Sequence, residues 1–238
     1  MVQAPQRTAP GGPALIRLLA RLTDVEFTES RQSLSDRLSQ WLHWTDAIAL
    51  STALGGKPPA VAAGTHVFSS AEDSECAGAR GALANTITND SVLGVPKKRR
   101  GMGQTDIEPA IDYPVFRQRY LTLQQTMETG IGTLRGRLRA RLAGRTPAMT
   151  RLAEVDAVME RALGPRERAL LATVPALLGQ HFERLRRAAL DTLADDASNN
   201  TPDAWLDVFR KDMQSVLLAE LDLRFQPVEG LLAALRTS

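Results

Sequence analysis

The sequence predicts an all-α protein, arranged as an irregular helical bundle or as helical hairpins with a long Gly/Pro-rich linker. Apolar residues recur at helical spacing along most of the chain, and no segment alternates convincingly at period two. Hydrophobic residues make up 43% of the 238 residues, which is enough to form a core and excludes disorder throughout. We expect an N-terminal helical pair over residues 1–54, a flexible linker over 55–112 and a C-terminal helical bundle over 113–238.

Two helices are expected before the linker. Over residues 13–22, leucines at i, i+3, i+4 and i+7 form one apolar face, with Arg17 and Arg21 on the other. These arginines interrupt the apolar run that a secretory signal requires. The second helix is expected over residues 34–54, where Ile48 lies on the apolar stripe and Trp44 widens it, and glycines after Leu54 end it.

The linker prediction depends on composition. Gly and Pro account for 12 of the 58 residues from 55 to 112, and the short hydrophobic pieces there have no sustained period. Either this segment is flexible, or it carries short elements that the sequence cannot place. It also holds a basic run, Lys97, Lys98, Arg99 and Arg100.

The C-terminal bundle begins with a long predicted helix. Asp112 is a suitable N-cap, and Pro114 in the first turn has no donor to lose, so a helix is predicted to about Gly144. Its apolar positions follow a three, four, four spacing, an eleven-residue pattern typical of a nearly straight packed helix.

Prolines predict how the remaining chain is divided. A shorter helix is expected over residues 148–163, followed by another that Gly164 and Pro165 begin and that extends toward residue 196. Within this second helix, Pro175 predicts a kink or short break near Val174. A further helix begins after residue 202, and Pro227 is expected to bend the chain into a last apolar turn over 228–235.

Charge is distributed unevenly along the chain. The net charge is only +2, yet residues 113–151 hold eight arginines and one acid, whereas 191–222 hold eight acids and two bases. These two faces could pair within the chain, pair across a homodimer, or bind two different partners.

The long basic helix carries its arginines in two rows. Helical spacing places Arg135 with Arg139, and Arg137 with Arg141, on either side of a leucine stripe at 134, 138 and 142. Flanking charges of this kind suit an interface. In the alternative interpretation they are merely solvated, because 25 Arg against 4 Lys indicates a general compositional preference for arginine.

No constellation of residues predicts an enzyme. His43, His66 and His181 do not occur in a metal-binding motif, and the single cysteine, Cys76, excludes both a disulfide framework and a Cys-rich zinc site. Neighbouring carboxylates should also raise the pKa of the Cys76 thiol. We predict no catalytic residue, no cofactor and no metal. Glu220 and Arg224, four residues apart on an apolar helix face, are expected to form a structural ion pair.

Nucleic acid is the alternative partner to protein. The run from Lys97 to Arg100, together with the arginine rows and Arg145, could contact phosphates in a salt-sensitive manner. No aromatic residue is interleaved with this run to stack on bases. No run reaches the roughly 18 apolar residues of a membrane span, so we expect no membrane insertion.

Two stretches carry a family resemblance: residues 33–54, SLSDRLSQWLHWTDAIALSTAL, and residues 207–235, DVFRKDMQSVLLAELDLRFQPVEGLLAAL. Together with the basic helix they resemble an uncharacterised proteobacterial domain-of-unknown-function family, which is all-helical and has no assigned activity. The resemblance implies a cytoplasmic accessory of an envelope complex. We therefore expect a non-enzymatic helical interaction or scaffold protein of the cytoplasm, with a protein partner or a homodimer.

Overall fold

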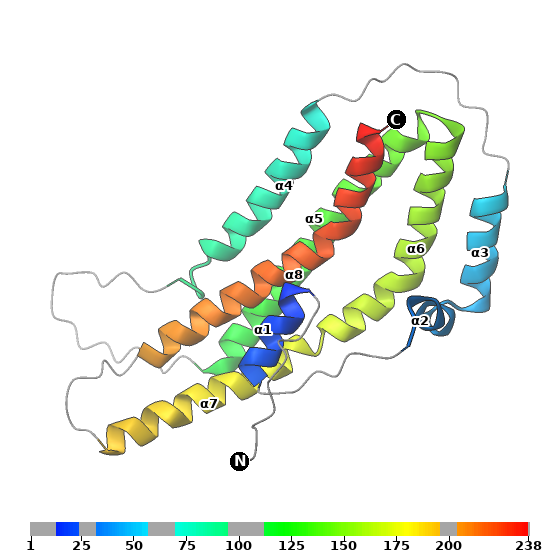
Figure 1. Cartoon of the computed structure of the whole chain (residues 1–238). Helices are drawn as coiled ribbons and strands as arrows, with labels where there is room; N and C mark the ends of the chain where they lie inside the picture. Colours follow the sequence, from blue (N-terminus) through cyan, green and yellow to red (C-terminus); the bar gives the residue numbers. More distant parts are fainter. Residues whose placement is uncertain (1–12, 24–31, 57–69, 95–111, 196–203, 238) are drawn as a thin grey trace, which may run out of the picture. The chain divides into compact units, whose positions relative to one another are not determined.

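The computed structural model describes residues 13–23, 32–56, 70–94, 112–195 and 204–237 (Figure 1). Within these residues all regular structure is α-helical, and no strand occurs, which confirms the predicted all-α class. The helices are α1 (Ala14–Thr23), α2 (Leu34–Trp41), α3 (Trp44–Gly55), α4 (Ser70–Thr88), α5 (Tyr113–Ala143), α6 (Pro147–Leu171), α7 (Val174–Asp195) and α8 (Ala204–Arg236).

The first predicted helix is present as α1, but the single helix predicted over 34–54 is wrong. Leu42 has an extended backbone, with φ −84° and ψ 123°, and ends α2. His43 is the N-cap of α3, and its backbone N–H donates to Asp46 Oδ2 at 3.2 Å. Asp36 caps the start of α2 in the same way, accepting from the Ser33 backbone N–H at 3.3 Å. Local capping therefore divides this region into two helices.

Helix α4 corrects the interpretation of residues 55–112 as a linker without a long element. Its 19 residues are rich in Ala, Ser and Gly. Large apolar side chains are few along it, so the spacing on which the prediction relied is nearly absent. Cys76 and Ile87 are nevertheless buried. The basic run from Lys97 to Arg100 lies outside the described residues.

Helix α5 begins where the sequence predicts, because Asp112 Oδ1 accepts the Tyr113 backbone N–H at 2.8 Å. Helix α6 differs from the prediction, since it continues through Gly164 and Pro165 to Leu171. Ion pairs to α5 lie on both sides of Pro165: Asp156 pairs with Arg135, and Arg168 pairs with Glu128. Packing along the whole length of α6 thus outweighs the local preference of proline to end a helix.

The predicted break near Val174 is confirmed, because α6 ends at Leu171 and α7 begins at Val174, with Pro175 in its first turn. The separate last turn predicted after Pro227 is not formed. Helix α8 continues through Pro227 to Arg236, and Val228, Leu231 and Leu235 are buried along it. Burial of this apolar face favours the continuous helix.

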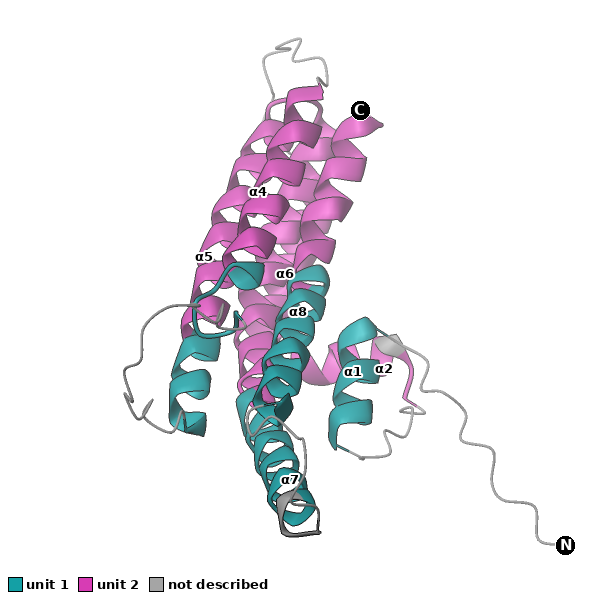
Figure 2. Cartoon of the chain, turned by 90° about the vertical axis from the view of Figure 1, so that its left-hand side faces the viewer, with its two compact units in different colours: residues 1–31, 87–121, 175–223 teal, residues 32–86, 122–174, 224–238 magenta. Residues whose placement is uncertain are grey.

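The chain forms two compact units, shown in teal and magenta in Figure 2. Unit 1 consists of residues 1–31, 87–121 and 175–223, and unit 2 of residues 32–86, 122–174 and 224–238. Unit 1 is built around an aromatic cluster. The rings of Phe116, Phe182 and Phe209 lie 5.0 to 5.9 Å apart, and Trp205 packs edge-on to Phe182.

Unit 2 is a four-helix bundle with two further helices on its side. Helix α4, residues 122–143 of α5, helix α6 and residues 224–236 of α8 run side by side (Figures 1 and 2). Leu134, Leu138 and Leu142 of α5 are almost fully buried among them. Helices α2 and α3 pack on α6.

Candidate interaction surface

The first arginine row of α5 faces α6 within unit 2. Arg135 Nη2 lies 2.6 Å from Asp156 Oδ1, and Arg139 Nη1 lies 2.9 Å from Asp156 Oδ2. Glu160 also pairs with both arginines. Burial opposes the charged form of Arg139, but hydrogen bonds to Asp156 and Glu160 outweigh it and raise the pKa of this guanidinium above its ordinary value. The ion pairs of Arg135 and Arg139 with Asp156 and Glu160 are called the α5–α6 seam.

The second arginine row faces α4. Arg137 Nε lies 2.8 Å from Glu75 Oε1, and Arg141 Nη1 lies 2.7 Å from Glu75 Oε2. The leucine stripe is buried between the two rows, so the predicted arrangement of rows on either side of it is confirmed. The sequence did not identify Glu75 as a partner, because it lies in the segment treated as a linker. Both guanidinium groups thus share one carboxylate within unit 2, and their side chains stay 51% and 40% exposed.

The other predicted side chains also have partners. Arg145 Nη1 donates to the Leu235 carbonyl at 2.7 Å. In unit 1, the buried carboxylate of Glu220 accepts a hydrogen bond from the Tyr120 hydroxyl at 2.6 Å. In unit 2, Arg224 Nη1 lies 3.2 Å from Glu167 Oε1. The pairing of Glu220 with Arg224 stays a prediction, because these two residues belong to different units.

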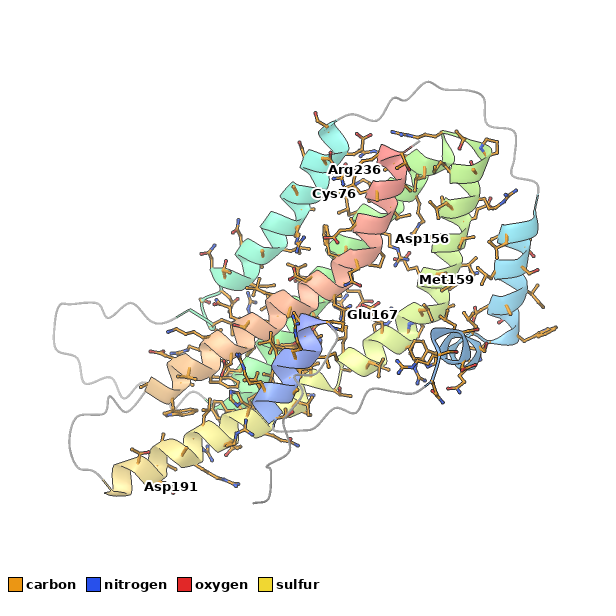
Figure 3. All side chains as sticks on the ribbon, viewed as in Figure 1. Cys76, Asp156, Met159, Glu167, Asp191 and Arg236 are labelled. Atoms are coloured by element: carbon orange, nitrogen blue, oxygen red, sulfur yellow. The ribbon has the colours of Figure 1, made fainter. Side chains whose placement is uncertain are left out.

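Unit 2 contains a small, partly open cavity lined by charged side chains. Its volume is about 190 Å³, and it lies between α5, α6 and α8, with Met159 and Glu167 among its lining residues (Figure 3). The charged side chains that line it form ion pairs with one another: Glu128 with Arg168, Arg135 with Glu160, and Glu167 with Arg224. Because these charges neutralise each other, the cavity offers no strong preference for a charged substrate.

His181, which occurs in no metal-binding motif, is buried in unit 1 next to two charged side chains. His181 Nε2 lies 2.8 Å from Asp212 Oδ2, and Arg184 Nη2 lies 3.0 Å from His181 Nδ1. A guanidinium can only donate, so Nδ1 accepts and Nε2 carries the proton toward Asp212. Arg184 also donates to the Leu22 carbonyl of α1. The three side chains therefore join α7, α8 and α1 structurally.

Three further observations on the described residues concern membrane spans, metal ligands and the cysteine. None of the described helices combines the length and apolar character needed to cross a bilayer. No three or more metal-ligating side chains gather in this part of the chain. Burial first, and then the Glu75 carboxylate, raise the pKa of the Cys76 thiol, as the neighbouring acids had led us to expect.

The prominent exposed feature of unit 2 is an apolar face of α3, here called the α3 stripe: Trp44, Ala47, Ile48, Ser51 and Leu54. The side chain of Trp44 is 80% exposed, that of Ile48 50% and that of Leu54 56%. At 100° per residue the stripe occupies one side of the helix. The expectation that Trp44 and Ile48 belong to a core stripe is therefore wrong.

The opposite face of α3 explains this orientation. Asp46, Ala49 and Leu50 are half-buried and Ala53 is buried, on the side where α3 packs against α6. The backbone carbonyl of Gly56, at the end of α3, accepts from Arg151 Nη2 of α6 at 3.4 Å. This mixed face of Asp46, Ala49, Leu50 and Ala53 thus packs on the bundle, and Trp44, Ile48 and Leu54 face away from α6.

The α3 stripe carries no charge. Asp46 is the only charged residue of α3, and its carboxylate accepts the backbone N–H of its own N-cap residue. By contrast, Trp41 of α2 lies under the guanidinium of Arg166, 5.4 Å from the ring centre. The low charge content of residues 44–55 is a sequence signal that could have identified this face.

Comparison with protein families matches the chain to a model described as "Protein of unknown function (DUF3348)", which covers residues 1–237. No curated protein and no solved structure matches the chain.

Proposed function

We propose that this chain, which belongs to the DUF3348 family, is a non-enzymatic helical interaction protein that binds another polypeptide through the α3 stripe. The observation that carries this proposal is the exposure of Trp44, Ile48 and Leu54 on a helix whose other face is packed against α6. Contiguous exposed apolar side chains of this kind mark interaction sites.

The size of the patch supports this role. Fully buried aromatic side chains cover about 150–250 Å² each, so the 80% exposed Trp44 alone presents on the order of 150 Å² or more. With Ile48 and Leu54 the stripe reaches on the order of 300 Å², the scale at which apolar patches are often functional. Tryptophan is also among the side chains that dominate binding energy at interfaces.

Nucleic-acid binding has less support. Arg135 and Arg139 are mostly buried against Asp156 and Glu160, so a phosphate would have to displace a carboxylate to reach them. Arg137 and Arg141 are about half exposed and share one carboxylate, that of Glu75. This alternative therefore depends on residues 97–100 together with Arg137 and Arg141. It predicts an affinity that falls steeply with salt, which an electrophoretic mobility assay over a salt series measures. An absence of any shift at low salt would exclude it.

Photo-crosslinking tests the proposal directly. A photoreactive amino acid at Ile48 of the full chain should give a discrete crosslinked species at near-native levels. The same amino acid at Leu170 of α6, which is 56% exposed but lies outside the stripe, should not. Equal crosslinking at both positions, or none at Ile48, would contradict the proposal. The resemblance to an envelope-associated family adds a cytoplasmic accessory role to this proposal, and the identity of the captured species tests that part.

A further inference from the structure

We propose that the occupant of the α3 stripe is a second copy of this chain, with the two α3 helices antiparallel about a two-fold axis. This inference rests on the proposed function and names its partner. Closed two-fold pairing is the most common arrangement among homo-oligomers, and it requires a surface that is complementary to itself. The α3 stripe meets this requirement in register, side-chain size and charge.

The register follows from the spacing along the stripe. Trp44, Ala47, Ser51 and Leu54 are separated by three, four and three residues, which is the spacing of successive core positions a, d, a and d of a heptad repeat. In an antiparallel pair centred on position 49, Trp44 lies opposite Leu54 of the second copy, and Ala47 lies opposite Ser51. Each of these contacts occurs twice because of the two-fold axis.

Side-chain size suits this crossing point. The small residues Ala47 and Ser51 occupy the centre, so the helix axes can approach to about 8 Å, the close end of the usual range. Trp44 and Leu54 lie toward the two ends of a helix whose 12 residues span about 18 Å. Ile48 flanks the centre and closes the side of the contact.

Charge favours a second copy over a charged partner segment. The stripe has no ionised side chain, so two copies meet without repulsion between like charges. A charged partner would gain no ion pair there and would lose hydration on burial.

The exposed area sets the expected strength. Two such stripes bury on the order of 600–800 Å² in total, below the roughly 1,200 Å² of standard stable interfaces. The dimer is therefore reversible and depends on concentration.

Analytical ultracentrifugation of the full chain tests the pairing. The weight-average mass should rise with concentration from 25.9 kDa toward twice that value. The variant Leu54→Glu should weaken dimerisation at least tenfold. Leu170→Glu introduces the same charge at an equally exposed site on α6 and should behave like the unmodified chain. A mass of 25.9 kDa at every concentration, or a Leu54→Glu variant that dimerises normally, would overturn the proposal.

Cysteine crosslinking tests the antiparallel register. A disulfide needs Cα atoms within about 7 Å, a distance that opposed core positions of a close helix pair can meet. Under mild oxidation, a mixture of Ala47→Cys and Ser51→Cys chains should form crosslinked dimers, whereas either variant alone should not. The native Cys76 is buried and serves as the common background. Efficient crosslinking of either variant alone would overturn the antiparallel arrangement.

The two proposals fail in different ways. A chain that stays monomeric, yet is captured by a different protein through a photoreactive group at Ile48, would overturn the second-copy inference and leave the proposed function standing. A monomeric chain without any capture at Ile48 would overturn both.

Discussion

Replacing Asp156 by alanine tests how much the charged seam between α5 and α6 stabilises unit 2. Asp156 Oδ1 accepts from Arg135 Nη2 at 2.6 Å, and Oδ2 accepts from Arg135 Nε and Arg139 Nη1, both at 2.9 Å. The substitution removes these three charge-assisted hydrogen bonds. The side chains of Arg135 and Arg139 are only 13% and 20% exposed, so water can replace only part of the hydrogen bonding that these guanidinium groups lose.

The magnitude follows from these contacts. A hydrogen bond to a charged group contributes about 1.5–3 kcal/mol, and breaking a fully buried ion pair costs about 3–5 kcal/mol. Here the seam is partly exposed, and Glu160 remains in reach of both arginines, at 3.7 Å from Arg135 Nη1. We therefore expect Asp156→Ala to lower the free energy of unfolding by about 2 kcal/mol, below the sum of the three bonds.

Urea denaturation followed by far-UV circular dichroism measures this loss. With a slope of about 2 kcal/mol per M, the midpoint should fall by about 1 M. Glu229→Ala is the control, because its ion pair with Arg80 is 53% and 44% exposed and should contribute about 0.5 kcal/mol or less. Equal midpoint shifts for the two variants would refute the argument that burial makes the α5–α6 seam strong.

Three further predictions concern packing and ionisation. Leu138→Ala, at a side chain with no exposed surface, should cost about 2–5 kcal/mol in the same urea assay, whereas Leu170→Ala at the surface should cost little. Gly179→Ala should destabilise unit 1 by about 1–3 kcal/mol, because the added methyl carbon would lie 2.8 Å from the Tyr113 ring; a neutral effect in thermal denaturation would count against this contact. Burial raises the pKa of Tyr113 to about 12. The contribution of the neutral phenol to the free energy of unfolding is therefore complete below pH 10 and is lost as the pH rises toward 12. Absorbance titration at 295 nm checks this value, with Tyr113→Phe identifying the signal.

Local signals account for most of the helices. Asp112 caps α5, Gly55 ends α3 in both the sequence and the structure, and the break before Pro175 follows from proline chemistry. These local signals do not predict the division between α2 and α3, although an aspartate follows the N-cap residue by three positions at the start of both helices. Ser33, three residues before Asp36, is a common N-cap, but His43, three residues before Asp46, is not.

The interior prolines show the limit of such local signals. Pro165 and Pro227 each predict an end or a bend, yet α6 and α8 continue through them. A proline costs a helix about 3 kcal/mol. Several ion pairs and buried leucines along the same helices can offset that amount, and these contacts join residues that are far apart in the sequence.

The helical class and the two arginine rows beside the leucine stripe can be predicted from the amino-acid sequence, because each depends on spacing within single helices. The family match also rests on the sequence, over residues 1–237. The packing of helices against one another selects the carboxylates that pair with those rows, since Glu75, Asp156 and Glu160 come from other helices. It also decides that Trp44 is exposed. A helix that is apolar on several sides has no preferred buried face until another helix covers one of them, and in this protein α6 packs against the face of α3 that carries Ala49, Leu50 and Ala53.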